Sequence, residues 1–165
     1  MSTERYTMPE FNMEFLIRAI ELADQNIDSG CGGPFGAVVV KDGQIIAEGA
    51  NHVTTQNDPT AHAEVVAIRQ ACKKLNTFQL EDCEIYCSCE PCPMCLGAIY
   101  WARPRAVYFA ANKTDAAHAG FDDSFIYDEI LLPHSERKIH TKHIPLQSAS
   151  KVFKKWLSLD DKTEY

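Results

Sequence analysis

The chain has 165 residues, of which 45% are hydrophobic and 24% are charged, and its formal net charge is -7 at pH 7. This length allows one domain with a sizeable core, so neither a disordered chain nor a small fold that needs a metal for stability is expected. The acidic balance disfavours a nucleic-acid partner, because a polyanion is repelled at long range, and it is compatible with a small neutral substrate.

No segment has the pattern of a signal peptide or a membrane span, since residues 1–16 are charged and no later apolar run is long enough. We therefore expect a cytoplasmic protein that does not bind a membrane. Its seven cysteines are an odd number, which a reducing compartment keeps as thiols, so metal binding or burial must account for them. A single domain is expected over residues 1–165, with a polar tail at 160–165.

A helix and two strands are predicted in the first fifty residues. Residues 10–28 have the pattern of an amphipathic helix, and a strand at 36–40 follows it. A turn at 41–43 and an antiparallel partner strand at 45–49 complete a hairpin. The apolar positions of the helix, which we expect to face the core, are Leu16, Ile20, Ala23 and Ile27.

Beyond residue 50, strands and helices alternate, which predicts a mixed sheet with helices on both faces. A loop over 51–60 leads into a helix that starts at Asp58-Pro59-Thr60 and has Val65, Ile68, Cys72 and Leu75 on its apolar face. The signals weaken to a loop after residue 110. The remaining predicted elements are strands at 84–89 and 106–110, a helix from Pro91 to about Trp101, a strand near 139–146 and a helix near 151–159.

The stretch CSCEPCPMC, residues 87–95, contains four cysteines and is compatible with a closed zinc site, an open zinc site or a redox pair. Cys92 and Cys95 are spaced i, i+3 in the first turn of a helix, so both sulfurs leave one face, where the positive helix end favours thiolate. Cys87 and Cys89 instead alternate along a strand. We interpret these two as small buried apolar residues.

A third metal ligand is available in the stretch HAE, residues 62–64, at the start of the preceding helix. His62, Cys92 and Cys95 are three protein ligands, which leaves the fourth tetrahedral position of a zinc ion for water, as in catalytic sites. Glu64 could instead cap the helix. Because residues two apart in a helix point about 200° apart, His62 and Glu64 can serve one site only where the helix begins.

The joint spacing, H-x-E followed by P-C-x-x-C, is the signature of zinc-dependent nucleobase deaminases. Zinc lowers the pKa of its water to about 7 and makes hydroxide available at neutral pH. Glu64 is then expected to move protons from the water to a ring nitrogen and to the departing amine, a role typically worth about 10²- to 10⁴-fold in rate. Ammonia leaves, and a carbonyl replaces the amino group.

The chain resembles the cytidine deaminase superfamily and, within it, the bacterial-type guanine deaminases, from about Leu16 to the last residue. The first three of the matching blocks are partly shared with the tRNA adenosine deaminases, whereas the fourth block and Tyr165 are similar to guanine deaminases. The blocks are GGPFGAVVVKDG (32–43), VTTQNDPTAHAEVVAIR (53–69), SCEPCPMCLGAIYWARP (88–104) and TDAAHAGFDDSFIY (114–127).

The resemblance implies a three-layer α/β/α fold with a central mixed five-stranded sheet, and hydrolysis of guanine at its 2-amino group to xanthine and ammonia. It implies one Zn²⁺ per subunit, with His62, Cys92 and Cys95 as ligands and Glu64 as the proton carrier. The implied substrate contacts are Phe35 as an aromatic wall, Asn51 as a donor, Asp123 as an acceptor, and the amides of Ala63 and Cys92 beside the metal. Separately, Trp101, late in the second metal helix, is a candidate cover for the base.

The resemblance also implies a homodimer in which the tail at 160–165 crosses to the other subunit and Tyr165 helps to close its active site. On the residues alone, Asn51 can equally bond its own backbone, Asp123 can be a solvated acid, and Phe35 and Trp101 can be packing residues. Two alternative functions stay open, a tRNA adenosine deaminase and a noncatalytic module with a closed zinc site made of Cys87, Cys89, Cys92 and Cys95.

Overall fold

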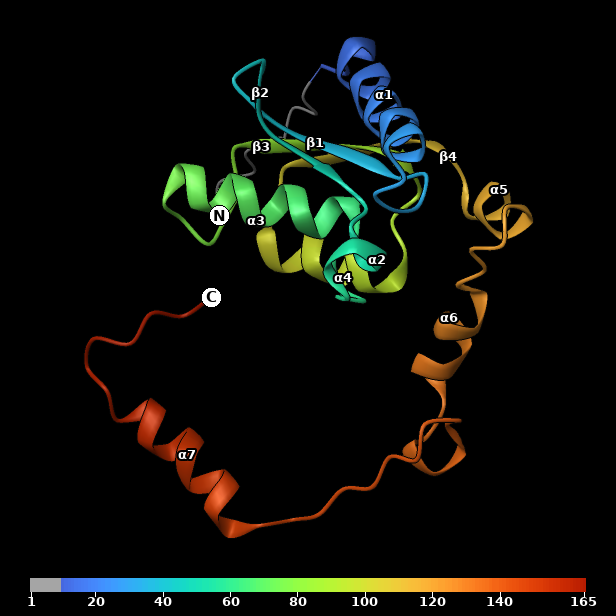
Figure 1. Cartoon of the computed structure of the whole chain (residues 1–165). Coiled ribbons are helices and arrows are strands. Elements are labelled where there is room, and N and C mark those ends of the chain that lie inside the picture. Colours follow the sequence, from blue (N-terminus) through green and yellow to red (C-terminus); the bar gives the residue numbers. More distant parts are fainter. Residues whose placement is uncertain (1–9) are drawn as a thin grey trace. The chain divides into compact units, whose positions relative to one another are not determined.

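The computed structural model describes residues 10–165, and the chain divides into two compact units, Met1–Asp123 and Ser124–Tyr165 (Figure 1). The first unit contains the sheet. Its elements are α1 (Met13–Ser29), β1 (Gly36–Lys41), β2 (Gln44–Ala50), α2 (Val53–Gln56), α3 (Ala63–Leu75), β3 (Cys83–Cys89), α4 (Pro93–Ala102), β4 (Ala106–Ala111) and α5 (Lys113–His118).

The four strands form one mixed sheet in the order β2-β1-β3-β4. Strand β1 is antiparallel to both β2 and β3, with Ala37 opposite Cys87 in the β1–β3 pair. Strands β3 and β4 are parallel, and α4 connects them, because parallel neighbours need a crossover connection. The hairpin predicted for residues 36–49 is confirmed.

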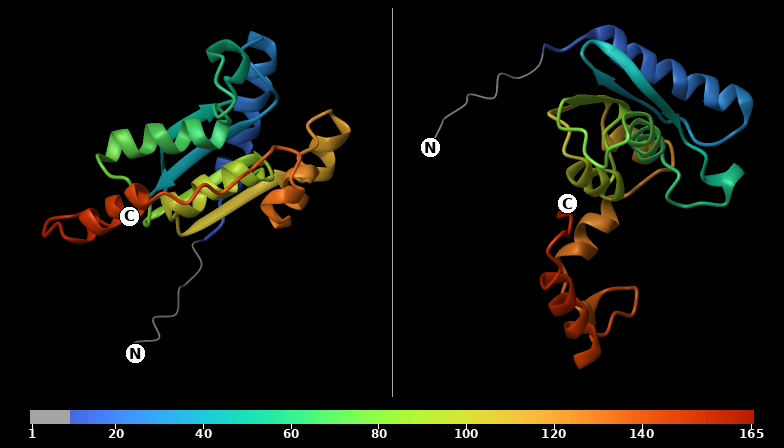
Figure 2. Two further views of the ribbon diagram at one scale, coloured as in Figure 1. Left: turned by 90° about the horizontal axis from the view of Figure 1, so that it is seen from below. Right: turned by 90° about the vertical axis from the view of Figure 1, so that its left-hand side faces the viewer.

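Helix α1 covers one face of the sheet, while α3 and α4 cover the other (Figures 1 and 2). Successive side chains of β1 point to opposite faces, as in any strand. Val38 and Val40 accordingly pack with Leu16 of α1, whereas Ala37 and Val39 join the core with α3 and α4. The three-layer α/β/α class is confirmed, although the sheet has four strands rather than the five that were expected.

The strand predicted near 139–146 is wrong. The second unit consists of α6 (Ser124–Leu131), a short 3-10 helix η1 (His134–Glu136) and α7 (Gln147–Leu157), and none of its residues forms a strand. Ile139, Ile144 and Leu146 are 81%, 59% and 61% exposed. A strand satisfies its backbone N–H and C=O groups by pairing, and residues 124–165 provide no partner strand.

The elements between residues 51 and 131 also differ in part from the prediction. The stretch 51–60 contains the short helix α2, and α3 begins at Ala63, several residues after Asp58-Pro59-Thr60. Residues 113–118 and 124–131 are helices where a loop was expected. The asparagine at 112 explains the first of these two helices, because its side chain caps the amides of Thr114 and Asp115 in a capping box.

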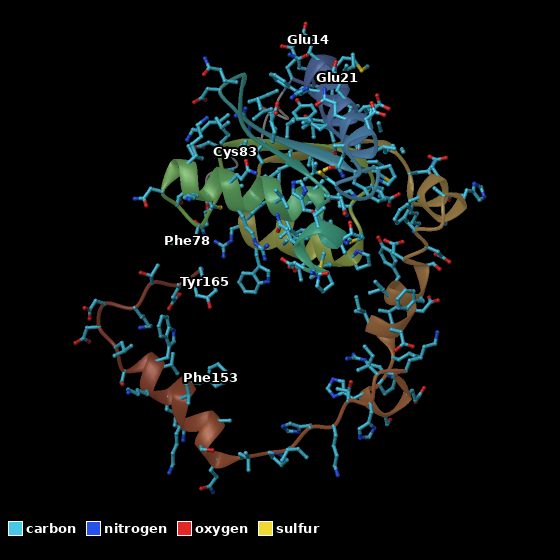
Figure 3. The ribbon with its side chains drawn as sticks, viewed as in Figure 1. Glu14, Glu21, Phe78, Cys83, Phe153 and Tyr165 are labelled. Carbon is cyan, nitrogen blue, oxygen red and sulfur yellow. The ribbon has the colours of Figure 1, made fainter. Side chains whose placement is uncertain are left out.

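Only some of the α1 residues that were predicted to face the core are buried. The buried residues of this helix are Leu16, Ala19, Ala23 and Asn26. Ile20 and Ile27, which were expected to face the core, are 44% and 55% exposed. Figure 3 shows Glu14 and Glu21 on the side of α1 that points away from the sheet.

The reason for this rotation of α1 is its close approach to β1. A Cβ atom at Gly36 would lie 2.2 Å from the carbonyl oxygen of Ala19 and 2.8 Å from the amide nitrogen of Ala23. Backbone meets backbone here, so small side chains occupy the contact line and the larger isoleucines lie at its edges. Among the helices of residues 10–165, none has the length and apolar character needed to cross a bilayer.

We predict that Gly36→Ala destabilises the fold, because the added methyl group overlaps the backbone of α1 and forces the helix away from the sheet. Overpacking of this kind typically costs about 1–3 kcal/mol, which denaturant-induced unfolding measures. Gly97→Ala is the matched control, since a Cβ at this helical glycine meets nothing within 4 Å and is expected to be neutral or stabilising. Equal unfolding midpoints for the two variants contradict the prediction.

Candidate metal centre and active site

The structure brings His62, Cys92 and Cys95 together at the N-terminal ends of two helices. His62 is the N-cap of α3 and Cys92 is the N-cap of α4, and both have extended backbone conformations. Cys95 lies one turn into α4 and is fully buried. Because an N-cap residue stands outside the helical hydrogen-bond ladder, its side chain can turn toward the neighbouring helix.

The distances between these three side chains suit a zinc ion. The Nδ1 atom of His62 lies 3.6 Å from the Sγ atom of Cys92 and 3.5 Å from that of Cys95. Zinc-to-nitrogen and zinc-to-sulfur bonds of ordinary length, at tetrahedral angles, place nitrogen and sulfur about 3.6 Å apart. Within residues 10–165 this is the one group of three or more potential ligands that converges in this way.

The electrostatics of the group favour metal binding. A hydrogen bond from the Cys95 thiol, helped by His62, lowers the pKa of Cys92 to about 4. The same hydrogen bond, together with burial, raises the pKa of Cys95, and the hydrogen bond to Cys92 raises the pKa of His62. Cys92 is therefore a thiolate at neutral pH, whereas Cys95 has to release its proton when a metal binds.

Glu64 lies beside these ligands without being one of them. It is 8% exposed in the first turn of α3, and burial raises its pKa, while a hydrogen bond from Cys95 acts in the opposite direction. The extended conformation of His62 allows His62 and Glu64 to face one site although they are two residues apart. The capping-box alternative for Glu64 is wrong, because the N-cap is His62 and makes no side-chain capping bond.

Cys87 and Cys89 are buried on β3, as the strand alternation predicted, and are 1% and 7% exposed. Burial raises the pKa of Cys87 well above its ordinary value and that of Cys89 to about 11. The group of converging ligands, His62, Cys92 and Cys95, which we call the metal group, contains neither of them. The geometry therefore does not support a closed site of four cysteines. All seven cysteines are free, which gives no support to a redox pair in its disulfide form.

Within the described part of the chain, only one half of the Asn51 side-chain amide is hydrogen-bonded. Its Oδ1 accepts hydrogen bonds from the amides of Gly33, at 3.3 Å, and Val53, at 3.2 Å. These two donors identify the oxygen, and Nδ2 makes no hydrogen bond within residues 10–165. The Asn51 side chain thus bonds the backbone of its own loop at Val53, as one interpretation held, and also the backbone of Gly33, while Nδ2 remains a donor.

Two aromatic rings and a carboxylate complete the neighbourhood. The rings of Phe35 and Phe121 pack edge to face, with centroids 4.9 Å apart and planes at 86°. Burial and the negative charge of Cys92 raise the pKa of Asp123, the last residue of the first unit. Phe121 was missed by the sequence reasoning, although its place two residues before Asp123 in GFDDSF was a usable signal.

Three further predicted site residues have different surroundings. Ala63 is the first residue of α3, where a helix amide has no partner within the helix and can face a ligand. Trp101 lies near the end of α4 and is 64% exposed. Tyr165 belongs to the second unit and is 69% exposed. The roles of all three in substrate binding stay predictions.

Residues 9–111 match the family described as the cytidine and deoxycytidylate deaminase zinc-binding region. The chain belongs to this zinc-binding deaminase family. The match covers both segments that carry the metal group, HAE and PCPMC, so the metal that this deaminase binds is zinc.

Individual relatives refine this placement. The chain is 62% identical to the guanine deaminase of Bacillus subtilis (strain 168) over 151 residues, which are 92% of this chain and 97% of the relative. It is 43% identical to the tRNA-specific adenosine deaminase of Aquifex aeolicus (strain VF5) over 120 residues, 72% of this chain and 76% of the relative. The X-ray structure of guanine deaminase from Bacillus subtilis superposes with a TM-score of 0.91, covering 94% of this chain and 99% of that one.

We predict that Cys95→Ala abolishes stoichiometric zinc binding, because it removes one of the three converging ligand atoms of this deaminase. Cys87→Ala is the matched control, as it removes an equally buried thiol from the same side of the sheet and is expected to retain one zinc per subunit. Elemental analysis after dialysis against a weak chelator provides the measurement. Zinc-free Cys87→Ala protein that is still folded would favour the closed four-cysteine site.

Proposed function

We propose that this chain is a zinc-dependent guanine deaminase, which hydrolyses guanine to xanthine and ammonia in purine base catabolism or salvage. The observation that carries the proposal is the convergence of His62, Cys92 and Cys95 beside a buried Glu64. The 62% identity to a guanine deaminase over 92% of the chain directs the choice of substrate.

His62, Cys92 and Cys95 hold the zinc in this proposal. Their three ligand atoms leave one tetrahedral position free for water, which is the arrangement of catalytic rather than structural zinc sites. A zinc ion bound there supplies a water molecule whose pKa is lowered to about 7, so that hydroxide is available at neutral pH. The thiolates of Cys92 and Cys95 would balance the charge of a bound zinc ion.

Glu64 moves the protons. It takes one proton from the attacking water and delivers it to a ring nitrogen. It then takes the second proton from the hydroxyl group on the ring carbon and gives it to the amine as the carbon–nitrogen bond breaks. A carbonyl replaces the amino group and ammonia leaves, so that one water is consumed for each ammonia. Burial supports this role, because it raises the pKa of Glu64 and makes its carboxylate a better proton acceptor than a solvent-exposed one.

Asn51, Asp123 and Phe35 recognise the base. Guanine is neutral and polar, and each of its buried donors or acceptors left unpaired costs about 1–3 kcal/mol. The Nδ2 group of Asn51 donates to the oxygen and ring-nitrogen edge, while the Asp123 carboxylate accepts from the amino and ring N–H groups. Phe35, backed by Phe121, forms the aromatic wall. The amides of Ala63 and Cys92 steady the water or the developing charge.

The working enzyme is, we propose, a cytoplasmic homodimer. The second unit supports dimerisation, because α7 has apolar residues that need a partner surface. Val152, Phe153 and Leu157 of α7 are 65%, 72% and 69% exposed, and Phe153 is drawn in Figure 3. The tail at 160–165 crosses to the other subunit, where Tyr165, with Trp101, covers the base. Seven free thiols support the reducing compartment.

The experiment that tests the activity is incubation of the purified protein with guanine, guanosine, adenine, cytidine and tRNA, with xanthine and ammonia measured together. We expect xanthine and ammonia in equal amounts from guanine and no turnover of the other four. The tRNA adenosine deaminase is the second candidate, because 43% identity connects the chain to that group. Inosine formed in tRNA, without xanthine from guanine, would establish it and overturn the proposal.

We predict that Glu64→Gln lowers kcat for guanine by at least about 10²- to 10⁴-fold, because glutamine keeps the shape of the side chain but cannot carry a proton. Zinc content and the unfolding transition should remain those of the wild type, since Glu64 is not among the converging ligand atoms. Loss of zinc in this variant would show that Glu64 has been assigned the wrong role.

We predict that deletion of residues 161–165 lowers kcat/KM by about tenfold or more, because a site that is not closed leaves the base poorly positioned. The unfolding midpoint should change little. Tyr165→Ala should reproduce most of the loss, while Thr163→Ala, a change of another exposed tail residue, serves as the control. Kinetics of the truncated protein equal to those of the wild type would exclude the tail from the active site.

A further inference from the structure

We infer that Asn26, a residue of α1 outside the metal group, is a positioning residue that sets the affinity for the base by holding Asn51 and the glycine loop together. The glycine loop is the stretch 30–36, GCGGPFG, between α1 and β1. The inference rests on the proposed function only for the identity of the base. Its structural part depends on contacts within the first unit.

The Asn26 side-chain amide bridges two chain segments. Its Nδ2 donates to the carbonyl oxygen of Gly33, at 2.9 Å, and to the carbonyl oxygen of Asn51, also at 2.9 Å. Asn26 is 4% exposed and lies on the inner face of α1. Both N–H groups of one amide are therefore used on two carbonyls that are 18 residues apart in the chain, and no water is needed between them.

The two carbonyls belong to the residues that shape the base site. Gly33 donates its own amide to Oδ1 of Asn51, which fixes the side chain and leaves Nδ2 without a hydrogen bond within residues 10–165. The Gly33 carbonyl also accepts the amide of Phe35, at 2.9 Å, and Asn51 donates its amide to the Phe35 carbonyl, at 3.2 Å. The bond from Asn26 to Gly33 therefore helps to position both the Asn51 side chain and Phe35.

The loop has little freedom to compensate for a lost contact. A Cβ atom at Gly32 would lie only 2.1 Å from the carbonyl oxygen of Asn51, so the loop backbone already rests directly on Asn51. The two carbonyls have negative oxygens close together, and only a side chain with two adjacent donors can join them. Asparagine has this geometry, whereas aspartate of the same shape presents acceptors only.

If Asn26 acts as a hydrogen-bond donor, Asn26→Asp should impair the enzyme more than Asn26→Ala. A role in packing alone does not predict this order. Asn26→Ala removes two hydrogen bonds, and we expect KM for guanine to rise about 3- to 10-fold, in keeping with the loss of one or two net hydrogen bonds. Asn26→Asp keeps the volume but places carboxylate oxygens against two carbonyls, so its KM should rise further. Zinc content should be unchanged and kcat should stay within about twofold, because neither metal ligands nor Glu64 are touched.

Asn12→Ala is the control for a general loss of helix stability. Asn12 caps the opposite end of the same helix by accepting the Glu14 amide, at 2.9 Å, and has no contact with Gly33 or Asn51. This variant should lower the unfolding midpoint and leave both kcat and KM unchanged. A KM increase in Asn12→Ala as large as that in Asn26→Ala would attribute the effect to helix stability and overturn the inference.

A double-mutant cycle tests whether Asn26 acts through Asn51. The initial slope at low guanine concentration gives kcat/KM for Asn51→Ala and for the Asn26→Ala, Asn51→Ala pair. We expect the second substitution to add little once the Asn51 amide is gone, because coupled residues are non-additive. Equal fold-changes in the two backgrounds, or a wild-type KM in Asn26→Ala, overturn the inference.

Binding to an inactive background separates this inference from the proposed function. Guanine is titrated into Glu64→Gln and into the Glu64→Gln, Asn26→Ala pair, and the dissociation constants are compared. The same rise of about 3- to 10-fold is expected in the pair. Failure of guanine to bind Glu64→Gln, together with no xanthine from the wild type, contradicts the proposed function. Equal dissociation constants for the two proteins contradict the role of Asn26 and leave the proposed function unaffected.

Discussion

The approach of two helix N-termini on one face of the sheet is the constraint on which the active site depends. Helices α3 and α4 pack together on the same face of the sheet, and each is preceded by an extended N-cap residue that carries a potential zinc ligand. A helix start has unpaired amides and a positive dipole end, which favour the Cys92 thiolate. The metal site is therefore a consequence of where these two helices begin rather than of any added loop.

The loop between α1 and β1 depends on close backbone contacts. Gly32 lets the loop after α1 approach Asn51, and Gly36 lets β1 approach α1, without steric overlap. Asn26 and Ser88 satisfy the polar groups that this approach buries, the first by bonding two carbonyls and the second by accepting the Gly36 amide at 3.0 Å. A buried polar group without a partner is costly, so these two side chains stabilise one particular loop conformation.

Local patterns predicted the first unit well because its elements have strong signals of their own. Strand runs such as GAVVV and the spacing of Cys92 and Cys95 do not depend on distant residues, and the buried strand state of Cys87 followed from simple alternation. The wrong predictions concern segments whose structure depends on contacts with residues distant in the sequence. Ile20 and Ile27 have the right period for a core face, yet α1 turns its alanines inward, because Gly36 brings the two backbones together. The stretch 139–146 has apolar residues suited to a strand but no partner strand in its unit.

The sequence by itself determined the chemistry: a histidine, two cysteines and a glutamate at spacings that only helix starts make useful, in a chain too acidic to favour nucleic acid. It could not decide whether Glu64 was a helix cap or a proton carrier, nor how Asn51 is held. Tertiary structure shows that α3 begins at an extended His62 without a side-chain capping bond, and that Asn26 of α1 reaches the carbonyls of Gly33 and Asn51, whereas the proton-carrying role of Glu64 stays a proposal. Spacing along a chain specifies which groups can share a helix face, whereas packing alone specifies which groups from different segments meet.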